Sequence, residues 1–126
     1  MKTVLVVDDE PVLRILLREI LQEEGYSVID AADGRSMLEL LQVQGVRPDL
    51  VLMDVMMPGI DGREAYQALR SRMDMPDLPV VMMSAAVQPS RLDPSIAAFL
   101  RKPFDLTELV DLVAHVIGPP HGDGRS

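Results

Sequence analysis

The stretch Leu50-Val-Leu-Met-Asp-Val-Met-Met-Pro-Gly-Ile-Asp-Gly62 joins a short apolar run to a dense turn. Leu50 to Met53 has the length and composition of a buried strand, because it is an apolar run bounded by a polar residue. Asp54 ends the run, and Pro58 to Gly62 predicts a turn. A helix is then expected from about Arg63 to Ser71. The sequence thus predicts a strand that ends at a carboxylate, then a turn, then a helix, which is an order typical of α/β folds.

Three other apolar runs also end at polar residues. Thr3 to Val7 is followed by Asp8 and Asp9, Val80 to Met83 by Ser84, and Ala98 to Arg101 by Lys102. If these strands lie parallel in one sheet, their carboxyl ends converge on one crevice, where ligands of open α/β sheets bind. We therefore expect three carboxylates, a hydroxyl and an ammonium to meet at one edge of the sheet.

Segments with helical periodicity separate the strands. We expect helices at Pro11 to Glu24, Asp33 to about Gly45, Arg63 to Ser71 and Asp105 to Gly118, and a further strand at Tyr26 to Ala31. This alternation predicts an α/β fold, a doubly wound five-stranded parallel sheet with helices on both faces. We expect one domain over residues 1–118, followed by a flexible tail or the start of a linker over residues 119–126.

The segment from Ala85 to Ala97 fits this scheme least well. A crossover helix is expected there, but the segment contains Pro89 and Pro94. A proline inside a helix costs about 3 kcal/mol. We therefore expect the fourth helix to be short or irregular.

Composition limits the class of protein further. The chain has 126 residues, which suits one domain, and no cysteines, which excludes disulfides and thiolate metal sites. Its net charge of -8 disfavours direct binding to nucleic acid or to an anionic membrane. We find neither a signal peptide nor an apolar segment of membrane-spanning length, so we expect a cytoplasmic location.

The carboxylates of the expected crevice require a cation. Two like charges about 4 Å apart repel by roughly 4 kcal/mol at an effective dielectric constant near 20. Oxygen ligands favour a hard ion, so Asp8 and Asp9 are candidate ligands of Mg²⁺. Asp54 is the candidate nucleophile, because a carboxylate can form an aspartyl phosphate. Lys102 would hold a phosphate oxygen, and Ser84 would offer a hydroxyl hydrogen bond.

Together these residues resemble the receiver domain of two-component response regulators, over about residues 3 to 117. The resemblance is carried by Val-Leu-Val-Val-Asp8-Asp9-Glu-Pro, Asp54-Val-Met-Met-Pro58-Gly-Ile-Asp61-Gly62, the strand ending in Ser84, and Lys102-Pro103-Phe104. It implies a flavodoxin-like sheet with strand order 2-1-3-4-5. It also implies that Asp54 accepts a phosphoryl group from a histidine kinase or a histidine phosphotransfer protein, in a domain that signals and is not an enzyme acting on other substrates.

The resemblance assigns roles to the metal ligands. Asp9 and Asp54 would bind Mg²⁺ directly together with the Met56 backbone carbonyl, and Asp8 would bind it through water. The Lys102-Pro103 peptide is expected to be cis, a state that is rare except before proline.

Receivers of this family also switch conformation. The matching residues are Ser84, whose hydroxyl the phosphate draws in, and Phe99, an aromatic that changes its exposure, with Pro103 beside them. Phosphorylation adds about -1.5 to -2 charges, which can bias a bistable loop.

Two departures from the family carry expectations of their own. Ser84 and Lys102 are closer in sequence than is usual, and the missing length falls on the fourth helix, which helps to form the family's output and dimerisation face. We therefore expect signalling through that face to be altered or absent, and at most a weak homodimer. Met56 and Ala85 offer no acid or amide to position water, so we expect slow loss of the phosphoryl group.

The first expected helix offers a candidate partner contact. Its apolar half consists of Val12, Leu13, Leu16, Leu17, Ile20 and Leu21, while Ile15 falls among polar residues. We expect Ile15 to be exposed. It would either pack on a neighbouring helix or face solvent, or, as the family suggests, contact the four-helix bundle of a kinase near Asp54.

Three other functional classes share parts of this pattern. A flavodoxin-like redox protein would carry a hydroxyl-rich and glycine-rich loop where Asp8, Asp9 and Glu10 stand. A phosphatase of the haloacid dehalogenase type would place Asp-x-Asp after its first strand. A receiver-like scaffold that binds a partner without being phosphorylated remains the alternative, although it would not need Asp9, Asp54, Ser84 and Lys102 together.

Overall fold

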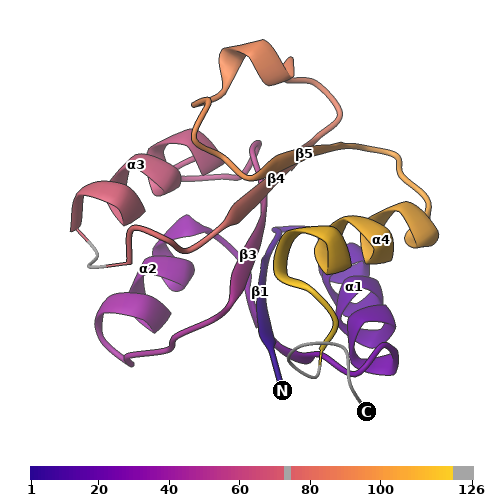
Figure 1. Cartoon of the computed structure of the whole chain (residues 1–126). Helices are drawn as coiled ribbons and strands as arrows, with labels where there is room; N and C mark the ends of the chain where they lie inside the picture. Colours follow the sequence, from indigo (N-terminus) through magenta and orange to yellow (C-terminus); the bar gives the residue numbers. More distant parts are fainter. Residues whose placement is uncertain (73–74, 121–126) are drawn as a thin grey trace.

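The computed structural model describes residues 1–72 and 75–120 of the chain (Figure 1). Five parallel strands form one sheet in the order β2-β1-β3-β4-β5, which confirms the predicted fold class. The strands are β1 (Thr3–Val7), β2 (Ser27–Ala31), β3 (Leu50–Asp54), β4 (Val80–Ser84) and β5 (Ala98–Arg101). The helices are α1 (Pro11–Glu23), α2 (Gly34–Gln42), α3 (Gly62–Arg72) and α4 (Leu106–Ile117), with a single 3₁₀ turn, η1 (Pro89–Arg91), between β4 and β5.

The sheet is covered on both faces (Figure 1). Helices α2 and α3 lie on one face and α1 and α4 on the other, and successive residues of each strand point to opposite faces. Leu5 and Val7 therefore join the core under α2 and α3, while Val4 and Val6 join the core under α1 and α4. All four side chains are fully buried. This double burial explains why the strands are continuous apolar runs and do not alternate with polar residues.

Local signals position the helices as the sequence predicts. Pro11 begins α1, and Asp33 caps α2 by accepting a hydrogen bond from the Ser36 N–H at 2.7 Å. Asp105 caps α4 by accepting from the Glu108 N–H at 2.8 Å. Gly118, with φ of 81°, follows the last turn of α4.

Gly62 matters because α3 begins close to the end of β3. A Cβ atom at this position would lie 2.6 Å from the Asp54 carbonyl oxygen and 2.8 Å from the Val55 Cα. Both contacts are with backbone, so a larger residue would push the helix away from the strand end. The glycine permits the close approach that sets the turn beside Asp54.

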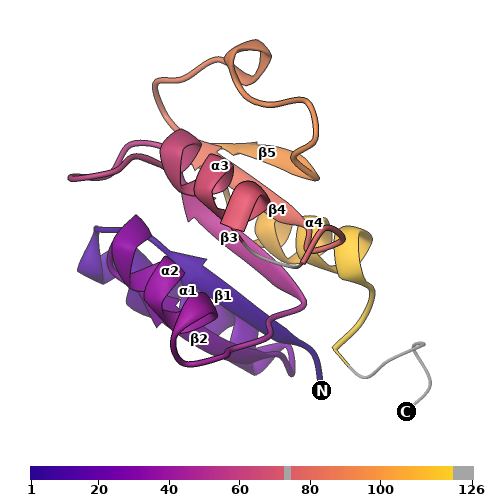
Figure 2. The ribbon, with the colours of Figure 1, turned by 90° about the vertical axis from the view of Figure 1, so that its left-hand side faces the viewer.

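The segment between β4 and β5 contains no regular helix, as its two prolines predicted. Leu92 anchors it in the core under α2 and α3, with only 7% of its surface exposed. Two hydrogen bonds to α3 also hold the segment. The Tyr66 hydroxyl lies 2.6 Å from Ser95 Oγ, and the Gln67 side-chain amide donates to Asp93 Oδ2 at 3.3 Å. The views in Figures 1 and 2 both show it arching beyond β5.

Helix α1 is less covered than its apolar half suggested. Leu17 and Leu21 are fully buried, and Ile15 is exposed as predicted, at 56%. Val12 and Leu16 are also exposed, at 80% and 41%. The sheet covers only the centre of the apolar stripe of α1, which contains Leu17 and Leu21. The margin of the stripe, Val12 and Leu16, stays exposed beside the loop before α4.

The ends of the described chain lie together. The Lys2 N–H donates to the Pro120 carbonyl at 2.9 Å. The predicted tail begins at Pro119, and its residues 121–126 lie outside the described part of the structure. Within residues 1–72 and 75–120, no helix has the length and hydrophobicity needed to cross a membrane.

Candidate functional site

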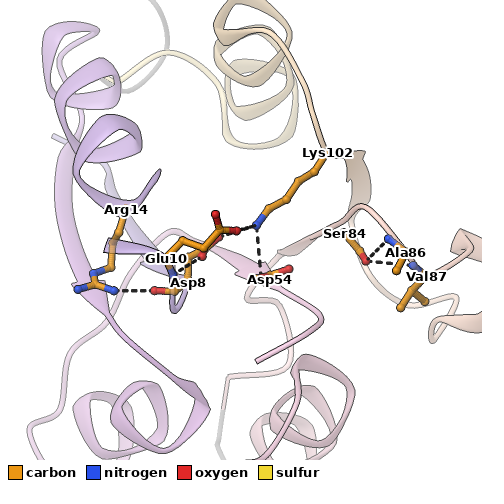
Figure 3. Close-up of polar contacts among 8 residues, drawn as sticks. All are labelled: Asp8, Glu10, Arg14, Asp54, Ser84, Ala86, Val87 and Lys102. Atoms are coloured by element: carbon orange, nitrogen blue, oxygen red, sulfur yellow. Dashed lines mark hydrogen bonds and ion pairs between the residues drawn. The ribbon is translucent and has the colours of Figure 1, made fainter. Parts of the chain in front are cut away.

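Polar residues from four strand ends lie at the carboxyl edge of the sheet, where Asp8 and Asp54 point toward Lys102 and Ser84 points toward Ala86 and Val87 (Figure 3). Asp8 follows β1, Asp54 and Ser84 end β3 and β4, and Lys102 follows β5. Asp8, Asp54 and Ser84 are 0%, 5% and 1% exposed, and in the described part of the chain they are the only polar residues buried to this degree. Burying polar groups is costly unless they are paired, so their gathering at one place marks a functional site.

The Lys102 ammonium lies at the centre of this group. Its Nζ is 2.9 Å from Asp8 Oδ2, 3.1 Å from Glu10 Oε1 and 3.3 Å from Asp54 Oδ2. Burial alone would lower the pKa of Lys102, but the neighbouring carboxylates outweigh burial and raise it. Lys102 therefore stays charged and opposes three negative groups with one positive charge.

Burial raises the pKa of Asp54 from 3.8 to about 6, and the charge of Asp8 adds to the rise. Lys102 and the Met56 backbone N–H act in the opposite direction without cancelling it. The ionised form of Asp54 is thus held at a free-energy cost. It remains the main form at neutral pH, and a carboxylate of raised basicity is a better nucleophile.

The donor set fits a hard divalent cation. One carboxylate oxygen each from Asp8, Glu10 and Asp54 lie within 4.8 Å of one another. Oxygen-only ligands in such an incomplete shell suit Mg²⁺, which retains several water ligands. A cation here would also relieve the excess negative charge that one lysine leaves unbalanced.

Two acidic residues lie differently from the sequence interpretation. Asp9, expected as a direct ligand, is partly exposed and is not among the three residues whose oxygens converge. Glu10 joins them, although we did not single it out as a site residue. The signal available in the sequence was its place in the run Asp-Asp-Glu after β1. The Glu10 N–H donates a hydrogen bond to Asp8 Oδ1 at 2.9 Å. This bond closes a short turn after β1, and the Glu10 carboxylate lies next to those of Asp8 and Asp54.

Ser84 is present at the strand end, but its hydroxyl is already engaged. Its Oγ accepts hydrogen bonds from the N–H groups of Ala86 at 3.1 Å and Val87 at 3.0 Å (Figure 3). These bonds hold the first residues of the segment between β4 and β5. A change in the orientation of Ser84 would therefore alter the hydrogen bonds that position the start of that segment.

The remaining site candidates surround this centre. Met56 is 52% exposed at the mouth of the crevice. Phe99 is partly buried against the core under α2 and α3, and the Arg101 guanidinium lies 5.2 Å from its ring centroid. The Lys102-Pro103 peptide is cis, as the resemblance implied.

An apolar groove of about 490 Å³ opens beside the crevice. Its lining includes Val12, Leu13, Leu16, Ala85, Phe104 and Leu106, with Glu10 and Lys102 at the side of the crevice. The exposed margin of α1 thus lies next to the acidic centre.

The fold and this centre define a class of protein, the receiver-type signalling domains built on a flavodoxin-like sheet with an acidic pocket, a hydroxyl and a lysine. The family model for the response regulator receiver domain matches residues 4–114. The chain belongs to this family.

Curated relatives and solved structures agree with the assignment. The response regulator MprA of Mycolicibacterium vanbaalenii is 44% identical over 98% of this chain and 54% of its own length. The transcriptional regulatory protein PdtaR of Mycobacterium tuberculosis is 35% identical over 89% and 55%. The chain thus spans about half the length of the curated relatives it matches.

Among solved structures, the chemotaxis protein CheY4 of Vibrio cholerae is similar with a TM-score of 0.83 and 32% identity, covering 92% of this chain and 98% of that one. The response regulator TrrA of Thermotoga maritima, determined in complex with Mg²⁺ and BeF, is similar with a TM-score of 0.77 and 36% identity, covering 92% and 99%.

Proposed function

We propose that this chain receives a phosphoryl group on Asp54 from a phosphohistidine of a histidine kinase or a phosphotransfer protein. The observation that carries the proposal is the convergence of Asp8, Asp54 and Lys102 in a buried crevice, with Lys102 Nζ 2.9 Å and 3.3 Å from the two carboxylates. Response regulator relatives support the assignment of the partner class.

In the transfer, an oxygen of the Asp54 carboxylate attacks phosphorus. The P–N bond to the donor imidazole breaks as the O–P bond forms, and the imidazole leaves with the bonding electron pair. Asp54 needs no general base, because it is already ionised at neutral pH. Lys102 shifts from its carboxylate partners to an oxygen of the arriving phosphoryl group and balances part of its charge.

The acidic residues would hold Mg²⁺. Asp8 and Asp54 supply oxygens from within the crevice, and the Met56 carbonyl and Asp9 complete the set that the family resemblance implies. Glu10 is a further oxygen donor, because it converges with Asp8 and Asp54. The ion, when bound, neutralises charge on the phosphoryl oxygens.

Ser84 and Phe99 would report the new charge. An added phosphoryl group attracts the Ser84 hydroxyl as a donor, while its oxygen accepts from the Ala86 and Val87 N–H groups. If the side chain rotates toward the phosphoryl group, these two hydrogen bonds at the start of the segment between β4 and β5 are weakened or broken. Phe99, on β5, and Pro103, in the loop after it, lie next in the chain after this segment and would move with it.

The donor protein would dock on α1. Ile15, Val12 and Leu16 form an exposed apolar margin beside the crevice, where an apolar helix bundle can cover them. A donor histidine on that bundle would then approach Asp54 directly.

The test is incubation with acetyl phosphate and Mg²⁺, followed by mass spectrometry of the intact protein. A gain of about 80 Da, one phosphoryl group, is expected in the native chain and not in Asp54→Ala. The Asp77→Ala variant, altered at an exposed carboxylate away from the crevice, should gain the same mass as the native chain. If the native chain remains unmodified while a known receiver in the same tube is phosphorylated, the chain is a scaffold that binds without phosphorylation.

A further inference from the structure

Arg14 lies in the first turn of α1 and has no role in the function proposed above. Its Nη1 donates a hydrogen bond to the Asp8 backbone carbonyl at 2.7 Å (Figure 3). The side chain is partly buried, and within residues 1–72 and 75–120 this carbonyl is its only hydrogen-bond or ion-pair partner. The bond therefore restrains the backbone after β1 and does not neutralise a carboxylate.

The bond from Arg14 completes the set of partners around Asp8, which is fully buried. The Asp8 N–H donates to the Ala31 carbonyl at 3.2 Å, on the side of the sheet. Its Oδ1 accepts from the Glu10 N–H at 2.9 Å, and its Oδ2 lies 2.9 Å from Lys102 Nζ. The carbonyl that Arg14 holds belongs to the peptide that leads from β1 into the turn, so Arg14 fixes the direction in which the turn departs.

The start of α1 lacks the side-chain cap that α2 and α4 have. Glu10 occupies the cap position without a side-chain cap hydrogen bond, and Pro11 has no N–H to offer. The Glu10 carboxylate lies instead 3.1 Å from Lys102 Nζ. Arg14 takes over the restraint at both ends of the turn, because its backbone N–H donates to the Glu10 carbonyl at 3.0 Å while its guanidinium binds the Asp8 carbonyl.

The turn carries two of the three carboxylates of the acidic centre. Oxygens of Asp8 and Glu10 converge with one of Asp54, which stands on β3 and does not depend on this turn. Removing the Arg14 guanidinium would leave the buried Asp8 carbonyl without its partner. A buried carbonyl without a partner is unfavourable, so the backbone would rotate towards another donor and carry both carboxylates with it.

We infer that Arg14 is a positioning residue for the acidic centre: it holds the turn after β1 so that Asp8 and Glu10 face a divalent cation together. The inference rests on the proposed function, in which these carboxylates hold Mg²⁺ beside Asp54. Replacing a residue that orients metal ligands through a hydrogen bond commonly lowers metal affinity by about 10-fold to 100-fold.

The sign of the effect separates orientation from charge. Arg14 is a cation beside an acidic cluster, so the loss of its charge alone would strengthen the binding of Mg²⁺. The loss of its hydrogen bond to Asp8 would weaken that binding. A weaker affinity in a variant without the guanidinium can therefore not be an effect of charge.

The test compares the native chain with three variants. Arg14→Met keeps the apolar stem and loses the donor, whereas Arg14→Lys keeps a charged donor. Lysine can replace arginine here because a single nitrogen of Arg14 makes the bond. The matched control is Arg18→Met, which removes the same charge one turn further along α1. Arg18 pairs there with Asp30 at 2.9 Å between partly exposed side chains, a kind of pair that contributes little to stability.

The first measurement is hydrogen exchange of the Glu10 N–H in EDTA, because its bond to Asp8 Oδ1 closes the turn. Exchange should be about tenfold faster in Arg14→Met and within about threefold of the native rate in the other two variants. Unchanged NMR shifts in β4 and β5 will show that each variant is folded.

The second measurement is the Kd for Mg²⁺ without any phosphoryl donor, from backbone NMR shifts of ¹⁵N-labelled protein. It should rise by about tenfold in Arg14→Met and stay within about threefold in Arg14→Lys and Arg18→Met. With acetyl phosphate, the Mg²⁺ concentration that gives half the maximal rate should rise in parallel. The rate at saturating Mg²⁺ should stay within about threefold, because Asp54 is positioned by β3.

Unchanged or tighter Mg²⁺ binding by Arg14→Met would overturn the inference. Equal weakening in Arg14→Lys or Arg18→Met would also overturn it, because the effect would then come from packing or from α1 as a whole. A native chain that binds no Mg²⁺ would contradict it as well. A native chain that binds Mg²⁺ but gains no phosphoryl group would contradict the proposed function alone, since hydrogen exchange and the Mg²⁺ titration require no donor.

Discussion

Replacing Asp54 by asparagine should stabilise the protein at neutral pH in the absence of divalent cations. Asparagine is nearly isosteric with the protonated aspartic acid and removes the buried negative charge. Burial and Asp8 raise the pKa of Asp54 from 3.8 to about 6. At about 1.4 kcal/mol for each pH unit, the ionised carboxylate costs the native state about 3 kcal/mol.

The pH dependence follows from the sign of this shift. Because the pKa is higher in the folded state, folded Asp54 keeps a proton between pH 3.8 and about 6 that the unfolded chain has released. The free energy of unfolding contributed by this residue therefore falls as pH rises through this window. The gain in Asp54→Asn should be about 3 kcal/mol at pH 7.5 and about 1 kcal/mol at pH 4.5.

The assay is urea unfolding of both proteins in EDTA, followed by circular dichroism at the two pH values. Asp77→Asn, at an exposed carboxylate away from the crevice, serves as the control and should change stability by less than about 0.5 kcal/mol. Added Mg²⁺ should stabilise the native protein more than the variant, because Asp54 is one of the proposed ligands. A loss of stability in Asp54→Asn at pH 7.5, or a gain independent of pH, would refute the electrostatic account of the crevice.

Three further changes test the site and the fold. Lys102→Ala should lower stability at pH 7.5 by about 1–3 kcal/mol in EDTA, since it leaves buried carboxylates without their cation, and Mg²⁺ should restore much of the loss in the same urea assay. Ile15→Asp should slow transfer from a phosphorylated donor protein by about tenfold or more without changing the rate with acetyl phosphate; equal rates with the protein donor would exclude this contact. Gly62→Ala should cost about 1–3 kcal/mol, because its Cβ would meet the backbone of Asp54, while Gly34→Ala, which meets only side-chain atoms of Ile60 and Ala65, should cost less; the reverse order in thermal unfolding would contradict this account of the turn after β3.

The order of elements along the chain could be predicted from local patterns. Buried strands are apolar on both faces, so runs such as Val4 to Val7 and Leu50 to Met53 are visible without a structure. Helix caps at Asp33 and Asp105 are equally local, since each involves a hydrogen bond to a residue three positions away. The irregular fourth crossover followed from Pro89 and Pro94, because proline removes a backbone donor wherever it stands.

The arrangement of side chains within the site was decided by tertiary contacts. Glu10 reaches Lys102 across 92 positions of sequence, and Asp9 lies outside the converging group although it is the neighbour of both Asp8 and Glu10. Local patterns indicate which residues stand at the strand ends. They do not indicate how each side chain turns, which depends on charges brought together through space.

The sequence by itself determined the parallel α/β sheet, the strand-end residues Asp8, Asp54, Ser84 and Lys102, and the irregular segment between β4 and β5, because hydrophobic burial and backbone geometry act over a few residues. Only the tertiary structure decided that Glu10 joins the acidic centre and that Ser84 binds the backbone of the next segment. Such contacts join groups whose separation in space local sequence does not specify.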